Sequence, residues 1–364
     1  MGESEGESEG EGEGSPGDGV SRCTDDELED LIRFHSRVQP ERSRPLDAAR
    51  IRWLFGANPC RPGDELTMWV CRRGGHIVGT YGAILVDLKV DNEMVPAAWS
   101  VDLLVDERWR GSGAAQELAD ARRQALGQRT YCALGISEAG HRFALRRGFV
   151  DMPPMSTYVW LADPSRLWHG TAPRLARMVR PLARAAVAPA YGLCRLRSRR
   201  IELVPIQCFD ERADTLWCQL APSYPALARR DTECLRWRFD SCPDSASYQR
   251  WYVSIGGLIV GYVVTQTLLR SEEPFLSIVD YLVAPHHLGA LFGSVALRAR
   301  AAGATGVVCR SLHLRANRAL RSLGYVKRRQ DVRFMVMSRD NDPLRPVLLD
   351  ASSWFATGAD SDVN

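Results

Sequence analysis

The chain has 364 residues, of which 45% are hydrophobic and 25% charged, a composition typical of globular proteins. This excludes a wholly disordered or collagen-like chain, and the length is enough for two domains. The net charge of +3 combines two opposed segments: residues 1–19 carry seven acidic and no basic side chains, whereas residues 164–200 carry nine arginines and no acid. The rest of the chain is nearly neutral, so we expect no specific nucleic-acid partner.

No uncharged apolar run approaches the ~18 residues needed to cross a bilayer. The first residues, Met-Gly-Glu-Ser-Glu, lack the basic and apolar regions of a secretory signal, and Gly6 stands where a myristoylation motif has Ser or Thr. The ten cysteines form no CxxC pair and no Cys/His run at zinc spacing. We therefore expect a cytoplasmic protein with reduced thiols, no metal and no transmembrane segment.

In chain order, the first expected feature is a disordered acidic tail over residues 1–20, whose Glu, Gly and Ser residues bury too little apolar surface to fold. The first predicted helix covers residues 25–38, and Thr24 and Glu27 have the spacing of a capping box. The elements expected after it are hairpin strands at 67–72 and 76–88 around Gly74-Gly75, a strand at 99–105, a helix at 114–126, a strand at 131–135, a helix at 141–147 ended by Gly148, and a closing strand at 157–161. This order indicates the α/β class, with helices on a mixed sheet.

Two distant segments share one sequence pattern. Residues 47–59 and 231–243 both fit D-x-x-x-[IL]-R-W-x-F-x-x-x-P. Three shorter matches follow in the same order: Gly-Gly-x-Ile-Val-Gly at 74–79 and 256–261, Val-Asp-x-Leu-Val at 101–105 and 279–283, and Gly-aromatic-Val at 148–150 and 324–326. Ordered matches of this kind indicate one module used twice.

The repeat sets the expected domain boundaries. They are a tail at 1–20, a first module at 21–160, an Arg-rich helical linker at 161–203, a second module at 204–340 and a C-terminal tail at 341–364. Pro173, Pro181 and Pro189 are expected to break the linker into short helical pieces. We favour a solvated basic connector, with peripheral contact to an anionic membrane, or to nucleic acid, as the alternative. The acidic tail is a candidate to shield this linker electrostatically.

A glycine-containing turn lies between the apolar strand ending at Val105 and the helix starting at Ala114. Gly111 and Gly113 free the backbone to turn several N–H groups toward one point, and the helix start adds its own unpaired N–H groups. Arg108 and Arg110 add positive charge. The pattern predicts a pyrophosphate site, with a plain strand-to-helix turn as the alternative.

Two common phosphate motifs are missing. The chain has no G-x-x-x-x-G-K-[ST], and Gln116 interrupts G-x-G-x-x-G, which disfavours a nucleotide triphosphatase or a dinucleotide oxidoreductase.

The strand, the stretch Arg108-x-x-Gly111-x-Gly113-Ala114, the following helix, strand and helix, and Gly148-Phe149 resemble the acetyl-CoA-binding core of the GCN5-related N-acetyltransferases, the GNAT family. The resemblance covers residues 24–160 and, more faintly, 204–338. It implies two bent mixed sheets and, in the first module, strands at 99–105 and 131–135 that splay apart to admit the pantetheine of acetyl-CoA or another acyl-CoA. The cofactor-binding residues that it implies are Leu104, Val105, Arg108, Arg110, Gly111, Ser112, Gly113 and Ala114.

Acyl transfer from a thioester to an amine requires removal of an amine proton, stabilisation of the oxyanion and departure of the thiolate. Asp102, on the strand beside the proposed thioester, is the first candidate base, with a structural role as the alternative because Asp280 occupies the same place in the second copy. Glu138 is a second candidate base, and Ser137 is a candidate to donate a proton through water. Many family members carry a Tyr at the position of Ala144, so no general acid is assigned.

The second copy has His286 and Leu291 where the first has Arg108 and Gly113, and keeps only Gly289. We expect this module to be degenerate for cofactor binding. The predicted function is transfer of an acyl group from acyl-CoA to the amine of a small molecule or peptide. The alternatives are a non-catalytic acyl-CoA-binding or regulatory protein and a Fem-type aminoacyl transferase.

Overall fold

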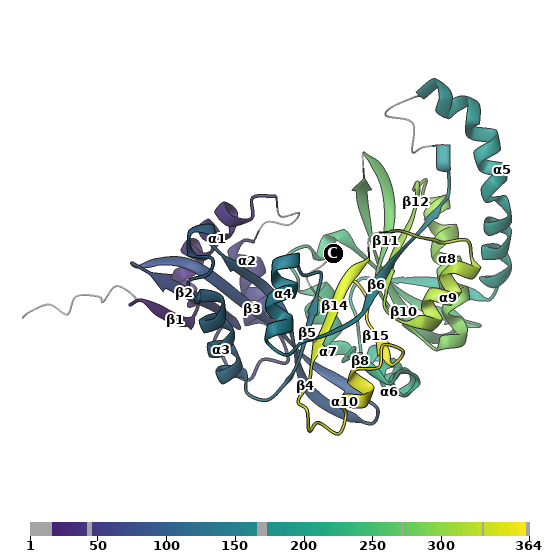
Figure 1. Cartoon of the computed structure of the whole chain (residues 1–364). Helices are drawn as coiled ribbons and strands as arrows, with labels where there is room; N and C mark the ends of the chain where they lie inside the picture. Colours follow the sequence, from purple (N-terminus) through teal and green to yellow (C-terminus); the bar gives the residue numbers. More distant parts are fainter. Residues whose placement is uncertain (1–16, 42–45, 166–172, 271, 330, 362–364) are drawn as a thin grey trace, which may run out of the picture.

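The structure is a computed structural model that describes the chain except residues 1–16, 42–45, 166–172, 271, 330 and 362–364. Two α/β modules lie side by side, and the long helix α5 (Pro173–Arg197) runs along the outside of the second (Figure 1). The first module contains β1 (Gly19–Arg22), α1 (Leu28–Val38), α2 (Ala48–Ile51), β2 (Met68–Arg73), β3 (His76–Val90), β4 (Glu93–Val105), α3 (Ala114–Leu126), β5 (Thr130–Leu134), α4 (Glu138–Arg146) and β6 (Val150–Leu161). The second module contains β7 (Ile201–Ile206), α6 (Arg212–Leu220), β8 (Ala226–Ala228), α7 (Thr232–Leu235), β9 (Tyr248–Ile255), β10 (Leu258–Arg270), β11 (Glu273–Val283), α8 (Leu288–Ala301), β12 (Gly306–Ser311), α9 (Leu314–Ser322), β13 (Val326–Lys327), β14 (Val332–Met337), α10 (Arg345–Leu348) and β15 (Trp354–Phe355).

Local sequence signals predicted most elements of the first module. The Thr24/Glu27 capping box is formed, α3 has the predicted limits, and Gly74 and Gly75 both adopt positive φ in the turn between β2 and β3. β4 and β6 are longer than predicted, because their extra residues pair with β3 and with strands of the second module. Most of the predicted acidic tail lies outside the described residues, but its last two, Gly19 and Val20, already belong to β1.

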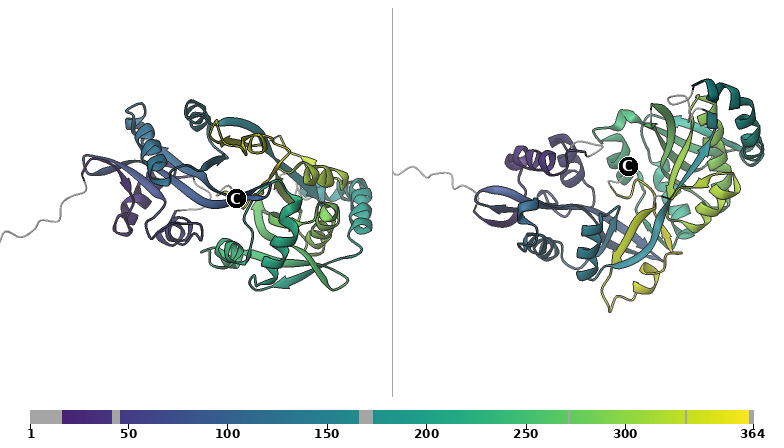
Figure 2. Two further views of the ribbon diagram at one scale, coloured as in Figure 1. Left: turned by 90° about the horizontal axis from the view of Figure 1, so that it is seen from below. Right: turned by 45° about the horizontal axis from the view of Figure 1, so that its top comes forward.

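β6 of the first module and β14 of the second each pair with strands of the other module. β14 pairs with β5, where Phe334 lies opposite Leu134, and its other edge pairs with the first half of β6. The second half of β6, from Ser156 to Leu161, pairs with β12. The strands thus form one continuous sheet in the order β1-β2-β3-β4-β5-β14-β6-β12-β11-β10-β9-β7, and Figure 2 (right) shows the yellow β14 between the two modules. The largest apolar core draws residues from both modules, so they are one folding unit.

The repeated Arg-Trp motif forms the same local structure twice. Asp47 accepts a hydrogen bond from the Arg50 amide at 2.7 Å and caps α2, and Asp231 caps α7 in the same way. In both copies a single π-helical turn follows, at Arg52–Gly56 and at Arg236–Asp240. The Asp of the motif therefore starts a helix that the Arg-Trp segment widens.

The connector differs from its prediction. Pro181 and Pro189 do not break it; both lie inside the single helix α5, which starts at Pro173. An internal proline costs a helix about 3 kcal/mol, but the alanines between these two favour helix, and the end of α5 packs closely on α8. A Cβ added at Gly293 of α8 would lie 3.0 Å from the carbonyl oxygen of Cys194. This tertiary contact holds the end of α5 that follows Pro189.

The segment predicted as a C-terminal tail is packed into the protein as far as Ser361. β15 pairs in parallel with β8, and Trp354 and Phe355 are buried. The Asp360 carboxylate accepts a hydrogen bond from Arg230 at 2.6 Å, and Arg230 also lies 3.3 Å from Asp280. Because all three of these charged side chains are buried, this cluster anchors the chain end to the second module.

Candidate active site

The strands β4 and β5 meet and then separate, as the resemblance implies. They pair in parallel from Ala97 opposite Thr130 to Ser100 opposite Ala133, and no pairing between them continues beyond that point in the described sheet. Past Ser100, β4 pairs only with β3, through a bulge next to Thr80. The bulge places Asp102 at φ 52°, a left-handed conformation that is rare for a residue other than glycine. A gap therefore opens beside residues 101–105.

The glycine turn lies at the end of β4. Gly111 and Gly113 have φ of 83° and 96°, and Gly113 is the residue directly before α3. The amides of Arg110 and Ser112 make hydrogen bonds of 3.3 Å to Glu107 and Trp109 within the turn. Among the described residues, no backbone group accepts a hydrogen bond from the amides of Gly111, Gly113 or Ala114. These three donors at a helix start are free for an anion.

Two arginines flank the turn and face solvent. The Arg108 side chain is 3.8 Å from Asp106 and that of Arg110 is 3.5 Å from Glu107, separations that exposed pairs hold weakly. Asp106 itself shapes the turn: its carboxylate accepts a hydrogen bond from the Arg108 amide at 3.0 Å, which, together with Arg37, lowers its pKa. The ionised Asp106 therefore holds the backbone, while both guanidinium groups stay available.

Asp102 lies near two polar residues that sequence patterns did not single out. The Thr80 hydroxyl donates to the Asp102 carbonyl oxygen at 3.0 Å, and the same hydroxyl is 3.3 Å from His35 Nε2. His35 and Thr80 are buried, whereas Asp102 is half-buried at the gap. The available signal for His35 was its place on the apolar stripe of α1, where a histidine is unusual.

Asp102 and its counterpart Asp280 have different surroundings. Asp280 is buried and contacts Arg230, and the hydroxyls of Tyr262 and Thr357 donate to it at 2.7 Å. The structural role that the repeat suggested is therefore evident in the second module.

Ser137 and Glu138 lie beyond the end of β5, on the other side of the gap from Asp102. The Ser137 hydroxyl accepts the Gly140 amide and caps α4. Arg333 lies on β14, and its guanidinium is 3.0 Å from the Glu138 carboxylate. This contact lowers the pKa of the Glu138 carboxyl. Ala144 is buried in α4, so the family tyrosine has no equivalent at this place. Ser137 is thus engaged in capping its own helix, and Glu138 in an ion pair with β14.

The second module lacks the glycine turn of the first, and the space between its separating strands is filled. Its helix α8 starts directly after the short turn Pro285–His287, and Gly289 lies inside the helix without positive φ. β11 and β12 also separate, beyond Ile278 and Cys309. The space there is occupied by the chain's own C-terminal segment, since Thr357 pairs with Ser311 of β12 and donates to Asp280 of β11.

Comparison with known proteins agrees with this geometry. Residues 20–137 match the family model of the acetyltransferase (GNAT) domain, a segment that runs from β1 to the start of α4 and includes the gap and the turn. The chain therefore carries a GNAT acetyltransferase domain over these residues. No curated protein matches the chain.

Three solved structures resemble most of the chain. A GCN5-related N-acetyltransferase from Anabaena variabilis has a TM-score of 0.59 and 13% identity, covering 87% of this chain and 71% of that one. The Saccharomyces cerevisiae N-myristoyltransferase with bound myristoyl-CoA has a TM-score of 0.57 and 13% identity, covering 87% and 82%. A GCN5-related N-acetyltransferase from Kribbella flavida has a TM-score of 0.56 and 14% identity, covering 87% and 70%. At these identities the likeness establishes the fold.

Within the described residues, no cluster of three or more His, Cys, Asp or Glu side chains is arranged to hold a metal ion.

Proposed function

We propose that the chain is an acyl-CoA-dependent N-acyltransferase that transfers an acetyl or other acyl group to the amine of a small molecule or peptide. The observation that carries the proposal is the coincidence of two features in the first module. The gap between β4 and β5 opens beside residues 101–105, and the free amides of Gly111, Gly113 and Ala114 lie at the end of the same strand. A slot for an extended chain next to an anion site suits a diphosphate with a pantetheine arm.

Each residue has a definite task in this proposal. The backbone near Leu104 and Val105 pairs with pantetheine, and the turn from Arg110 through Ser112 to Ala114 receives the pyrophosphate. Arg108 and Arg110 neutralise its charge. Glu117, in the first turn of α3, would repel phosphate, but Arg73 binds it at 2.7 and 2.8 Å.

Asp102 is the proposed base that accepts the amine proton, because it is half-buried at the gap. Burial lowers the water content around the reacting groups and strengthens the effect of a strand amide on the developing negative charge of the thioester oxygen. Glu138 is a weaker candidate, since Arg333 lowers the pKa of its carboxyl and so makes the carboxylate a weaker base. Ser137 remains the proposed donor toward the leaving sulfur, acting through water.

The direct test is thermal stabilisation of the full chain by acetyl-CoA. Gly113→Trp should abolish the stabilisation, because the indole would occupy the anion site. Gly127→Trp is the control: Gly127 follows the other end of α3 with φ 64° and open space around it, so this variant also places a Trp at a positive φ, but away from the anion site. No stabilisation of the unaltered chain at millimolar CoA, or equal loss in both variants, would contradict the proposal.

Release of free thiol from acetyl-CoA across a panel of amines separates an enzyme from a binding protein. An acyltransferase releases thiol only when a suitable amine is present. A non-catalytic acyl-CoA-binding or regulatory protein would be stabilised by the cofactor and release none.

A further inference from the structure

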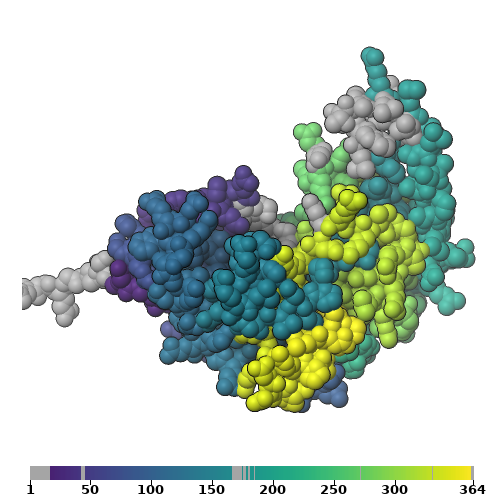
Figure 3. Space-filling model, viewed as in Figure 1, coloured from purple at the N-terminus to yellow at the C-terminus, as the bar shows by residue number. Residues whose placement is uncertain are grey.

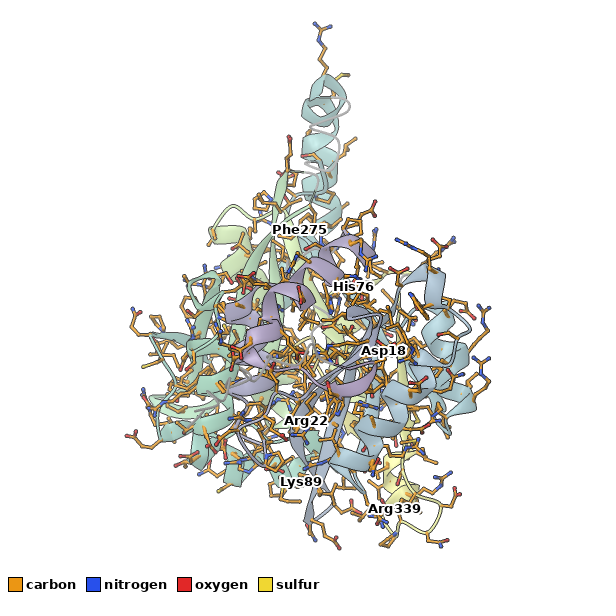
Figure 4. The ribbon with its side chains drawn as sticks, turned by 90° about the vertical axis from the view of Figure 1, so that its left-hand side faces the viewer. Asp18, Arg22, His76, Lys89, Phe275 and Arg339 are labelled. Atoms are coloured by element: carbon orange, nitrogen blue, oxygen red, sulfur yellow. The ribbon has the colours of Figure 1, made fainter. Side chains whose placement is uncertain are left out.

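One surface of the second module has no part in acyl transfer. The first half of α5 projects beyond the rest of the module, and the hairpin between β10 and β11 rises on the same side (Figure 1). Figure 4 shows the projecting helix at the top of the molecule, with Phe275 of β11 below it and Lys89 and Arg339 at the opposite end. We use the term projecting surface for residues 173–187 of α5 and 268–270 of β10.

The projecting surface exposes large apolar side chains. Met178 and Leu182 are 76% and 73% exposed, and because they are four residues apart they lie on one face of the helix. Leu269, near the tip of the hairpin, is 75% exposed. A single exposed leucine is ordinary, but three such side chains on two projections of the same side of the module indicate contact with something apolar.

The helical part of the projecting surface is basic. Residues 173–187 contain four arginines and no acid, and Arg174 is exposed there. The hairpin offsets only part of this charge: Arg270 is followed by Glu272 and Glu273, one acid in excess, and Glu273 is turned toward the body, where it accepts a hydrogen bond from Thr305 at 2.6 Å. Apolar and positively charged groups therefore occur together.

We propose that the projecting surface docks the protein on a membrane containing anionic lipids. Exposed aliphatic side chains between arginines suit the boundary of a bilayer. The aliphatic side chains contact the lipid acyl chains there, and the arginines contact the lipid phosphates. None of the helices in the described part of the chain has the length and apolarity to span a membrane. The helix would therefore lie along the membrane surface.

Other occupants of this surface are less suited to it. Nucleic acid would use the arginines, but it offers nothing to Met178, Leu182 and Leu269, and the projecting surface has no aromatic residue on which a base could stack. A second copy would bring two basic helices together. The acidic start of the chain leads into β1, which lies at the opposite end of the molecule from α5 (Figure 1).

The test is flotation of the full chain with vesicles of phosphatidylcholine alone or with 30% phosphatidylserine. The chain should float with the vesicles that contain phosphatidylserine and not with those of phosphatidylcholine alone. Added salt should weaken this flotation. The double variant Met178→Glu/Leu182→Glu should lower the partition at least about tenfold. Leu258→Glu is the matched control: Leu258 is equally exposed, at 73%, but lies at the far end of β10 from the hairpin tip, so its change should leave flotation unaltered.

The neutral double variant Met178→Gln/Leu182→Gln separates loss of apolar contact from added negative charge, and it should also weaken flotation. Because both side chains face solvent, we expect all variants to keep the melting temperature and the stabilisation by acetyl-CoA. Absence of flotation with anionic vesicles, flotation that the double variants leave unchanged, or binding to duplex nucleic acid without binding to vesicles would each overturn the proposal.

Discussion

Trp53 and Trp237 bind each other reciprocally. The indole nitrogen of Trp53 donates to the backbone oxygen of Trp237 at 2.7 Å, and that of Trp237 donates to the backbone oxygen of Trp53 at 3.0 Å. Their rings stack with centroids 5.5 Å apart and planes at 29°. The two residues are 184 positions apart and occupy the same place in the repeated motif. The approximate symmetry that relates the two modules therefore passes between these side chains.

Removal of either tryptophan should destabilise the whole chain. We expect Trp53→Ala and Trp237→Ala each to lower the free energy of unfolding by about 3 kcal/mol, because a large stacked side chain is lost from the contact between the modules. The double variant should lose at least about 1 kcal/mol less than the sum, since the second truncation finds the stack already broken. Urea unfolding of the four proteins gives the cycle, and strictly additive losses would argue against direct coupling.

The Arg230 cluster should be far more sensitive than an exposed pair. Arg230→Met leaves the carboxylates of Asp280 and Asp360 buried without their cation, so we expect a loss of about 3–5 kcal/mol in the free energy of unfolding. Arg212→Met removes the partner of Asp210 near the surface and should cost less than about 1 kcal/mol. Chemical denaturation of both variants makes the comparison, and similar small losses would contradict the burial argument.

Stability should fall in mild acid because of His313. Burial lowers the pKa of this histidine to about 4, and the charge of Arg315 adds to the effect. The unfolded chain therefore takes up a proton between about pH 6.5 and 4, which the folded chain does not, so stability declines as the pH falls through this window and levels off below it.

We expect this effect of His313 to lower the free energy of unfolding by about 2 kcal/mol between pH 7 and pH 5. His313→Phe should remove this part of the pH dependence, measured by urea unfolding at each pH. His76→Phe, which changes an exposed histidine, serves as the control. If both variants keep the wild-type slope, protonation of His313 does not limit stability in acid.

Asp102→Asn should separate catalysis from cofactor binding. Asparagine tolerates the left-handed backbone at this position, so the fold and the stabilisation by acetyl-CoA should persist. Acyl transfer should fall about 100-fold if the carboxylate accepts the amine proton. Asp91→Asn, with a similar φ of 51° in the turn before β4, is the matched control.

Glu138→Gln should change the rate of acyl transfer less than about threefold, because Arg333 lowers the pKa of this carboxyl and makes it a weak base. A large loss with Glu138→Gln and none with Asp102→Asn would reverse the assignment. Steady-state kinetics with one amine acceptor measures both.

The parts of the fold that depend on neighbouring residues could be predicted from the sequence. The turn at Gly74-Gly75, the limits of α3 and the positive φ of Gly111 and Gly113 follow from steric rules that act over a few positions. The gap beside residues 101–105 required the family resemblance as well. The sequence of β4 contains no signal for the bulge that gives Asp102 its positive φ.

The remaining features depend on distant partners. Nothing in residues 332–337 indicates that they pair with β5 rather than within their own module. Any apolar strand of suitable length could form hydrogen bonds with the same strand edge. The continuous helix α5 depends on its contact with α8, which holds the end that follows Pro189. His35 could not be assigned because its proximity to Thr80 arises only when α1 packs on the sheet.

The position of β14 also affects how the chain is made. β5 is complete once residue 134 leaves the ribosome, but the strand that covers its edge is made about 200 residues later, roughly 10–40 s at typical rates of synthesis. Until then the amino-terminal half has a bare strand edge of the kind that promotes aggregation. Figure 3 shows the yellow end of the finished chain lying against the lower part of the blue half. A nascent chain that stops before β14 has no native means of closing that edge, so early truncation would harm the half already made.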